Sequence, residues 1–326
     1  MSYIESAKTY TGNDLETIFF RPMLSGPSAA DLGVRILYNM PVPTTIQFWS
    51  GNKNVLQKFT EAGWTGGNPA VKQQKTIALN RVKAEMGFSA ADYFSLVYEL
   101  VTNRSDVNMG DLTGTELEQA ETSLFKDSIA ESIRATMWVG DTSATSGYNT
   151  FDGLLKSIVR GINDGVVDSS VTYSEADMKS PQAAFELFES VWEMAPETLR
   201  DMKGDGQLAF FVTQDLCHLY EKYLDSAGVD TAYIDAQNGR QTLSYHGIPI
   251  IDTRVASYLR GTSLPKSFCL LTDRRNLVLA VNTSDFPGTE VRMWYNPDEM
   301  ENRQRAVFMA GCDVLDHELL SIAYKA

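Results

Sequence analysis

Residues 113–158, TGTELEQAETSLFKDSIAESIRATMWVGDTSATSGYNTFDGLLKSI, predict a long helix followed by a glycine-containing loop. Thr115 and Glu118 have the spacing of a capping box, which places the start of the helix near residue 115. Apolar residues recur at helical spacing as far as Trp138, and charged residues fill the other side. The predicted apolar side comprises Leu117, Ala120, Leu124, Phe125, Ile129, Ile133 and Met137. A helix over 115–138 is roughly 35 Å long and, with two unlike faces, can act as a half-exposed rod.

Beyond this helix the sequence predicts a mixture of short helices and strands. Ser180 followed by Pro181 predicts the start of a helix, because serine is a good N-cap and proline suits the first helical position. Residues 208–213 predict a buried strand, and residues 214–227 predict a helix. Further apolar runs predict strands at 248–251, 268–272, 277–281, 291–295, 305–309 and 319–324. The fold class is therefore α+β.

The part of the chain that precedes the long helix predicts two extended segments. Residues 1–43 are interrupted by proline and glycine but carry many apolar residues, which indicates an arm that lies on a surface and contributes no core element. TTIQFWS at 44–50 predicts a strand, and residues 76–88 predict another whose apolar phase changes near Asn80–Arg81, as at a bulge. Together, residues 44–88 predict a two-stranded ribbon with a glycine-rich tip. Because a two-stranded hairpin is marginal in water, the ribbon needs another surface to lie on.

Composition sets limits on partners and location. The chain has 326 residues, of which 43% are hydrophobic and 21% charged, as in a globular protein of one large or two interleaved domains. Its net charge of −14 argues against strong binding to DNA phosphates, although an acidic protein can still enclose DNA. The three cysteines form no CxxC pair, and neither a signal peptide nor an apolar run of membrane-spanning length is visible. We therefore expect synthesis in a cytoplasm and no membrane partner.

The motifs of common enzymes are missing from the sequence. There is no Gly-Lys pair for a phosphate-binding loop, no HExxH zinc helix and no GxSxG nucleophile turn. Among the three histidines, His218 follows Cys217 on a predicted helix, where adjacent side chains do not face each other. His246 precedes a glycine and is interpreted as a turn residue. These patterns predict that the chain is not an enzyme.

One polar cluster near the C-terminus can be interpreted in two ways. It comprises Asp313, Asp316, His317 and Glu318. All four side chains are potential metal ligands, which would suit a metal-dependent enzyme. A solvated turn before the last strand also explains them and needs no metal. We adopt the second interpretation and predict no catalytic, cofactor-binding or metal-binding residue and no cofactor.

The order of these segments resembles the major capsid proteins of tailed bacteriophages, whose fold is shared with encapsulins and with the floor of herpesvirus capsids. GWTGGNPAVKQQKTIALNRVKAEMGFSAADYF at 63–94 resembles the returning half of the family's extended loop. Residues 113–158 resemble its spine helix and the Phe-Asp-Gly-Leu-Leu entry into the axial domain. Four further segments resemble the axial domain and the closing strands of the family. They are LAFFVTQDLCHLYEKYL (208–224), LSYHGIPIIDT (243–253), SFCLLTDRRNLVLAV (267–281) and RQRAVFMAGCDVLDHELLSIAY (303–324).

The resemblance implies a tailed-phage major capsid fold with five parts. They are an N-terminal arm at 1–43, an extended β-ribbon loop at 44–88, a peripheral domain at 89–150 and 286–316 with a long spine helix at 115–138, and an axial domain at 151–285 and 317–326. No scaffolding extension precedes the arm, which implies a separate scaffolding protein or earlier removal of the extension. The lysine and asparagine that cross-link some members have no match here, so that activity is not carried over.

By this resemblance we expect a structural protein that self-assembles into pentamers and hexamers of an icosahedral shell around double-stranded DNA. The expected partners are copies of the chain itself, a separate scaffolding protein, a portal and non-specifically packaged DNA. The expected location is the capsid of the virion, after assembly in the cytoplasm of the bacterial host.

Five aromatic residues of the arm and the ribbon are the candidates for contacts between subunits, because large rings dominate interfaces. They are Phe19, Phe20, Phe48, Trp49 and Trp64. Two alternatives stay open: an encapsulin-like protein compartment and a metal-dependent enzyme. The prolines and glycines of residues 1–43 favour the phage shell, because encapsulins resemble the family with a helix at the N-terminus.

Overall fold

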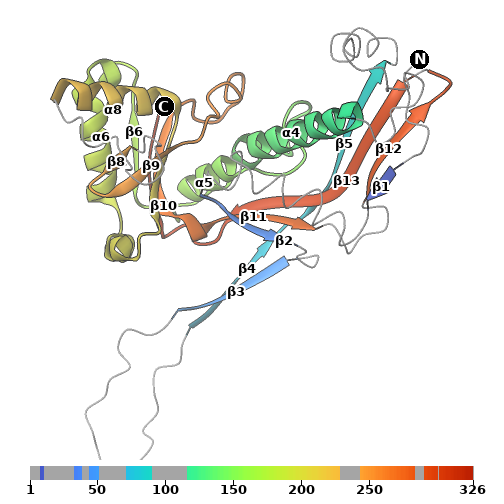
Figure 1. Cartoon of the computed structure of the whole chain (residues 1–326). Coiled ribbons are helices and arrows are strands. Elements are labelled where there is room, and N and C mark those ends of the chain that lie inside the picture. The colour runs from blue at the N-terminus through green and yellow to red at the C-terminus, as the bar shows by residue number, and fades with distance from the viewer. Residues whose placement is uncertain are drawn as a thin grey trace, which may run out of the picture.

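The computed structural model of the chain describes residues 8–10, 33–38, 44–50, 71–89, 116–227, 243–282, 290–299 and 301–325. Within this part of the chain, a long helix joins two six-stranded sheets. A two-stranded ribbon projects away from both sheets (Figure 1). The predicted α+β class is therefore confirmed.

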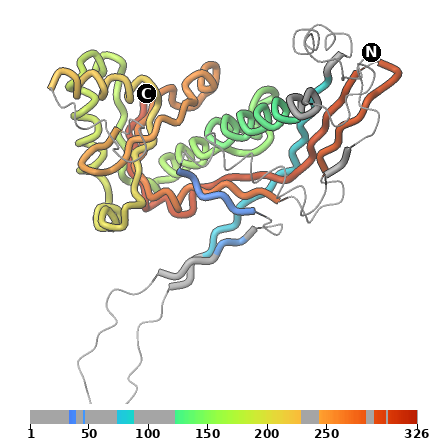
Figure 2. Tube along the Cα trace, in the orientation of Figure 1, coloured from blue at the N-terminus to red at the C-terminus, as the bar shows by residue number. Residues whose placement is uncertain are grey.

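The first sheet, here called the β13 sheet, has the strand order β1-β12-β13-β11-β2, and β5 pairs with β13 beside this path. Its strands are β1 (Lys8–Tyr10), β2 (Arg35–Tyr38), β5 (Asn80–Ser89), β11 (Leu277–Asn282), β12 (Glu290–Asn296) and β13 (Glu301–Val314). Neighbouring strands are antiparallel except β2, which runs parallel to β11. An early and a late segment of the chain therefore lie side by side in this sheet (Figure 2).

The second sheet, here called the β10 sheet, has the order β6-β14-β10-β7-β9-β8. Its strands are β6 (Ser170–Tyr173), β7 (Leu208–Val212), β8 (Ser244–Tyr245), β9 (Ile248–Asp252), β10 (Phe268–Asp273) and β14 (Leu320–Lys325). Helices α6 (Pro181–Met194) and α8 (Gln214–Ala227) pack on one face, where Phe210 and Leu271 point. Helix α5 (Leu154–Asn163) packs on the other face, with Phe211 and Leu270. The short helix α7 (Glu197–Asp201) follows α6.

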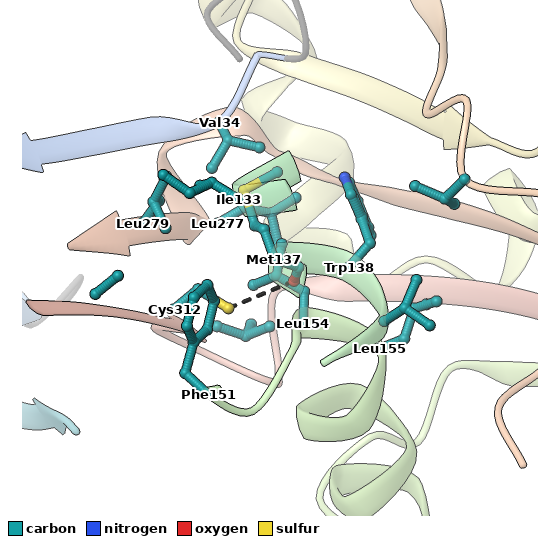
Figure 3. Close-up of a cluster of buried hydrophobic side chains, with 14 of the residues drawn as sticks. Val34, Ile133, Met137, Trp138, Phe151, Leu154, Leu155, Leu277, Leu279 and Cys312 are labelled. Atoms are coloured by element: carbon teal, nitrogen blue, oxygen red, sulfur yellow. Dashed lines mark hydrogen bonds between the residues drawn. The ribbon is translucent and has the colours of Figure 1, made fainter. Parts of the chain in front are cut away.

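The end of helix α4 (Glu116–Val139) forms the core that both sheets share (Figure 3). Trp138 is fully buried, and its ring centroid lies 5.7 Å from those of both Phe211 and Phe268 in the β10 sheet. From the β13 sheet, the Cys312 thiol donates a hydrogen bond to the carbonyl oxygen of Met137 at 3.4 Å. The two sheets are thus fixed to each other through one helix end.

Two glycines allow the chain to turn from α4 into α5. The Gly153 N–H donates to the Gly140 carbonyl oxygen at 2.8 Å. A Cβ atom on Gly140 would lie 2.2 Å from the Phe151 carbonyl oxygen, and one on Gly153 would lie 2.6 Å from the Gly140 nitrogen. A side chain at either position would force these backbone segments apart, so the close approach requires glycine.

The long helix predicted over 115–138 is confirmed at Glu116–Val139. Its buried side, however, is narrower than the predicted apolar side. Leu124 is 51% exposed. The described members that are buried are Phe125, Ile129, Ile133 and Met137. Leu124 and Phe125 are neighbours about 100° apart on a helix, and only Phe125 faces the sheet. No helix in the described residues combines the length and the apolar character that crossing a membrane would need.

Most other predicted elements are confirmed. Helix α6 starts as predicted, with the Ser180 Oγ accepting a hydrogen bond from the Ala183 N–H at 3.3 Å and with Pro181 at the first position. The predicted strands correspond to β3 (Thr44–Ser50), β7, β9, β10, β11, β12, β13 and β14, and the helix at 214–227 is α8. Helix α5 and strand β6 were not predicted. Strand β11 falls within the predicted axial range but is hydrogen-bonded in the β13 sheet.

The prediction that residues 1–43 contribute no core element is wrong for residues 33–38. Val34 is buried, and β2 pairs with β11 from Arg35↔Val278 to Tyr38↔Val281. The proline and glycine residues bracket a short apolar run, and such a run is long enough for a strand of 4 residues.

The ribbon consists of β3 (Thr44–Ser50) and β4 (Val71–Ile77), which are antiparallel from Thr44↔Ile77 to Ser50↔Val71. The chain leaves this pairing at Ala78–Leu79, and β5 then pairs with β13. The predicted change in the apolar alternation therefore marks the place where the chain passes from the ribbon to the β13 sheet. This place lies slightly before the predicted Asn80–Arg81. The ribbon pairing described by the structure ends at Ile77.

Candidate assembly surfaces

The ribbon carries two of the five aromatic residues predicted to contact other subunits. In the register of β3 and β4, Phe48 lies opposite Gln73, and Trp49 lies opposite Lys72. The other three candidates, Phe19, Phe20 and Trp64, lie outside the described residues. The described structure therefore places two of the five on one projecting element, and the prediction that the five contact other subunits stays a prediction.

A small core anchors the root of the ribbon on the β13 sheet. Ile77 and Leu79 are buried against Val278, Ala280 and Met309. Beside them, Gly311 of β13 lets the ribbon strand pass, because a Cβ atom there would lie 2.1 Å from the Ala78 carbonyl oxygen. Backbone, rather than a movable side chain, would have to shift to make room. The direction in which the ribbon leaves the sheet is thus set by close backbone packing.

An ion pair ties the ribbon to the sheet at the same root. Lys75 Nζ of β4 lies 3.3 Å from Asp313 Oδ2 of β13, and both side chains are partly buried. The Ser157 hydroxyl of α5 donates to Asp313 Oδ1 at 2.6 Å. A polar hollow of about 360 Å³ lies beside this contact, lined among others by Lys156 and Arg160. Three elements from distant parts of the chain therefore meet at one carboxylate.

Ser157, Asp313 and His317 come together, but not as a hydrolase triad. His317 Nε2 lies 3.2 Å from Ser157 Oγ and 3.3 Å from the Ser157 carbonyl oxygen. Because the serine hydroxyl donates to Asp313, the imidazole Nε2 must carry a proton and cannot accept one from this serine. In a triad the histidine stands between serine and aspartate, whereas here the serine does. Burial, followed by the nearby Lys75 charge, lowers the pKa of His317 and favours the neutral ring.

The remaining residues of the predicted polar cluster build a turn. The Asp316 N–H donates to Asn276 Oδ1 at 2.8 Å, and the Glu318 N–H donates to Asp316 Oδ1 at 2.9 Å. Within the described ranges, no group of three histidine, cysteine, aspartate or glutamate residues is placed to hold a metal ion. The interpretation as a turn is therefore confirmed for Asp316 and Glu318, but it is wrong for Asp313, which lies in strand β13 and pairs with Lys75.

The other histidines and the cysteine beside one of them also have simple structural settings. His218 is exposed and lies 3.6 Å from Glu221. Burial raises the pKa of the Cys217 thiol to about 12, with a further contribution from Glu221, so this thiol is a poor nucleophile at neutral pH. His246 and Gly247 both have positive φ angles, 48° and 83°, and form the tight turn between β8 and β9.

A lysine bridge holds the loop between α4 and α5. Lys156 Nζ lies 2.6 Å from Asp141 Oδ1 and 2.7 Å from Asp152 Oδ1. The hydrogen bonds from Lys156 and then Ser143 lower the pKa of Asp141 to about 2. Asp152 lies just before α5 and four residues before Lys156, so this pair is close in the sequence. Lys75 and Asp313 are more than two hundred residues apart, and no local pattern pairs them.

An apolar groove of about 370 Å³ lies between α4 and β5. Its apolar lining includes Val82, Ala84, Met86, Phe125, Ile129 and Tyr148. Together with the exposed Leu124, it leaves one side of the long helix able to make apolar contacts. The groove and Leu124 are apolar surface that the described part of the subunit leaves accessible.

Comparison with known proteins shows similarity at the level of the fold. No family model and no curated protein matches the sequence. The structure resembles a chain of the satellite phage P4 procapsid, which includes the size determination (Sid) protein, with a TM-score of 0.55 and 14% identity over 97% of this chain and 92% of that one. It also resembles a chain of Mycobacterium phage Ogopogo, with a TM-score of 0.51 and 8% identity over 100% and 96% of the two chains.

A third similar structure is the capsid of the empty GTA particle, with a TM-score of 0.50 and 11% identity over 92% of this chain and 90% of that chain. All three likenesses cover nearly the whole length of both chains, so they concern the complete fold and not one shared motif. The chain therefore has the tailed-phage major capsid fold, as its sequence predicted.

Proposed function

We propose that this chain is a major capsid protein whose copies assemble into pentamers and hexamers of an icosahedral virion shell around double-stranded DNA. The observation that carries the proposal is the projecting ribbon. A two-stranded hairpin is marginal alone, and this one extends beyond the surfaces of its own subunit (Figure 1). On a neighbouring copy the ribbon would gain the contacts that its own chain does not supply. The capsid fold of the similar structures supports the same role.

The proposal includes partners and a location. The net charge of −14 suits a shell that encloses DNA without gripping it, so packaging is non-specific. A separate scaffolding protein and a portal take part in assembly, which occurs in the cytoplasm of the bacterial host, and the product is the virion capsid. The subunit has a peripheral domain around the β13 sheet and an axial domain around the β10 sheet, and it works by geometry and not by catalysis.

Electron microscopy of the purified full chain tests this proposal. The chain is expressed with and without a scaffolding protein and viewed by negative stain. We expect rings or closed shells, and a persistent monomer or dimer under both conditions would overturn the proposal. The contents of shells formed in the native host separate two classes of container, because DNA supports a virion and packaged enzymes support a compartment of the encapsulin type.

A ribbon variant and its control assign the contact to the aromatic residues. Trp49→Ala is expected to reduce the shell yield about tenfold or more, because large buried aromatics are the common hot spots of interfaces. Lys222→Ala, at an exposed position of α8 outside the ribbon, is the control and should assemble normally. Both variants should keep the melting temperature of the free subunit. Equal yields for the two variants would remove Trp49 from the contact.

A further inference from the structure

The segment between β9 and β10 is positively charged, whereas the chain as a whole is negatively charged. Residues 253–267, here called the basic loop, contain Arg254, Arg260 and Lys266 and no aspartate or glutamate. All three cationic side chains are exposed. In a chain with a net charge of −14, a segment of this length without any acidic residue is a local reversal of sign. An exposed cationic segment attracts carboxylates or phosphates.

The basic loop is firmly built into the β10 domain. Val255 and Leu259 are buried on the face of the sheet that also carries α5. The Thr253 N–H and hydroxyl both donate to the Val212 carbonyl oxygen, at 2.9 and 3.0 Å. The ring of Tyr258 packs edge-on against Tyr148, with centroids 5.4 Å apart. The cations are therefore presented from a fixed support and not from a loose tail.

Arg254 occupies a backbone position that does not favour arginine. Its φ angle is 53°, in the left-handed region that glycine and asparagine adopt most easily. The Asp252 Oδ1 accepts a hydrogen bond from its backbone N–H at 2.9 Å, so the conformation is held by the backbone and by a neighbour. Neither contact uses the guanidinium group. A strained residue with an exposed side chain, and with no ion pair to that side chain among the described residues, points to a role for the side chain outside the subunit.

A surface of opposite charge lies on α6. Glu186, Glu189 and Glu193, here called the acidic stripe, are exposed at helical spacing, and α6 contains no lysine or arginine. Within the described residues, none of these three carboxylates has an ion-pair partner. Like charges three and four residues apart on a helix repel each other and destabilise it. The stripe is thus unfavourable in the free subunit and would be relieved by a cationic partner.

The two charged surfaces lie on opposite faces of the same sheet, so one subunit cannot join them. The basic loop packs on the face that includes Phe211 and Leu270, whereas α6 packs on the face that includes Phe210 and Leu271. Figure 1 shows α6 at the outer side of the β10 domain and the segment between β9 and β10 on the side toward α4. Such an arrangement suits a head-to-tail contact, in which two different patches of identical copies meet and close a ring.

We propose that the basic loop of one copy binds the acidic stripe of the next copy around the ring. The inference rests on the proposed assembly into rings and adds the contact that sets the order of neighbours in them. Lys266 also lies near Glu175, but that carboxylate is already paired with Lys325 at 2.8 Å. The contact steers negatively charged copies together in one orientation, and added salt weakens it.

Charge reversal tests the contact. The loop variant carries Arg254→Glu, Arg260→Glu and Lys266→Glu, and the stripe variant carries Glu186→Lys, Glu189→Lys and Glu193→Lys. All six positions are exposed, so circular dichroism and melting should show folded subunits. Each variant alone is expected to lose ring formation about tenfold or more, because like charges then face each other at every contact. A variant with all six changes restores opposite charges and should recover rings.

Mixing the two single-surface variants gives the sharpest outcome. Each contact in a ring that alternates the two variants joins surfaces of opposite charge. An alternating ring closes with an even number of copies, so the mixture should recover hexamers and not pentamers.

If the wild-type chain forms no rings, the proposed function fails. If the wild type and both variants form rings equally well, only this contact is overturned. Salt-sensitive binding of double-stranded DNA by the wild type, lost in the loop variant whose rings are intact, would also overturn the contact and assign the basic loop to DNA.

Discussion

The core around Trp138 and the ribbon of β3 and β4 are built in opposite ways. At Trp138, one helix end is enclosed by side chains from both sheets and from α5. In the ribbon, the strands pair with each other, and Thr45, Gln74 and Thr76 are exposed, with the two threonine hydroxyls 3.3 Å apart. The difference shows where the stability of the subunit comes from. The core supplies it from within one chain, whereas within the described residues the ribbon is held at its root alone, and we propose that neighbouring copies add the remaining contacts.

The largest expected effect comes from emptying the core. Trp138→Ala should lower the free energy of unfolding by about 3–5 kcal/mol, because a large ring is lost and the surrounding sheets cannot close the cavity fully. Denaturant unfolding of the free subunit measures this loss. Trp192→Ala is the matched control, because Trp192 is only half buried and its ring faces the Lys203 ammonium at 5.2 Å. An equal loss for the two variants would contradict the special role of Trp138.

The next largest effect is expected where the ribbon meets the sheet. Gly311→Ala should lower the free energy of unfolding by about 1–3 kcal/mol, because the new methyl group meets the Ala78 carbonyl oxygen and the backbone must shift. Gly204→Ala is the control, since a Cβ atom there meets nothing within 4 Å. Thermal unfolding compares the two variants, and a neutral Gly311→Ala would mean that the root adapts easily.

The contrast between core and ribbon also explains what the sequence could predict. Helix α4 and the start of α6 depend on neighbouring residues, and the capping signal at Ser180 and the periodicity up to Trp138 carried enough information. The ribbon was predicted because its β-branched and aromatic residues precede a glycine-rich stretch. These are local properties of the chain.

The errors and omissions concern contacts between distant residues. Leu124 and Phe125 are equally apolar, and only the position of the sheet decides which of them is buried. Strand β2 has 4 residues, too few to give a recognisable strand pattern in the sequence, and it depends on pairing with β11. The contact of Lys75 and Ser157 with Asp313 joins three separate segments. No spacing along the chain could have indicated it.

A smaller effect is expected from the ion pair at the ribbon root. Lys75→Met and Asp313→Asn, combined in a double-mutant cycle, should give a coupling energy of about 0.5–1 kcal/mol, because both groups are only partly screened by water. Asp313→Asn alone should cost more than Lys75→Met, since Asp313 also accepts hydrogen bonds from Ser157 and from the Val314 N–H at 2.8 Å.

Hydrogen exchange at residues 71–77 reports whether this ion pair holds the ribbon. Either variant should speed exchange there and leave exchange in α6 unchanged, because α6 packs on the other sheet. Unchanged exchange in the ribbon strand would mean that Ile77 and the close packing at Gly311 hold the root without the ion pair.

The smallest expected effect is a change of pH dependence at the turn between α4 and α5. The Lys156 ammonium and Ser143 hold the pKa of Asp141 at about 2, below its ordinary value of 3.8. A carboxyl group whose pKa is lowered by folding adds stability that is complete above the unfolded value and is lost as the pH falls through the folded value. Asp141→Asn should therefore lower the melting temperature above about pH 4 and have progressively less effect toward about pH 2.

Lys156→Met should flatten the same pH window, because it removes the main cause of the lowered pKa. Melting curves of the wild type and of both variants, recorded from about pH 5 to about pH 2, measure the effect. The partly exposed turn is screened by water, so the shift should be smaller than that of any core variant. A pH dependence of Asp141→Asn that is as steep as that of the wild type would show that other carboxylates govern this window. The turn would then owe its shape to Gly140 and Gly153 and not to the lysine bridge.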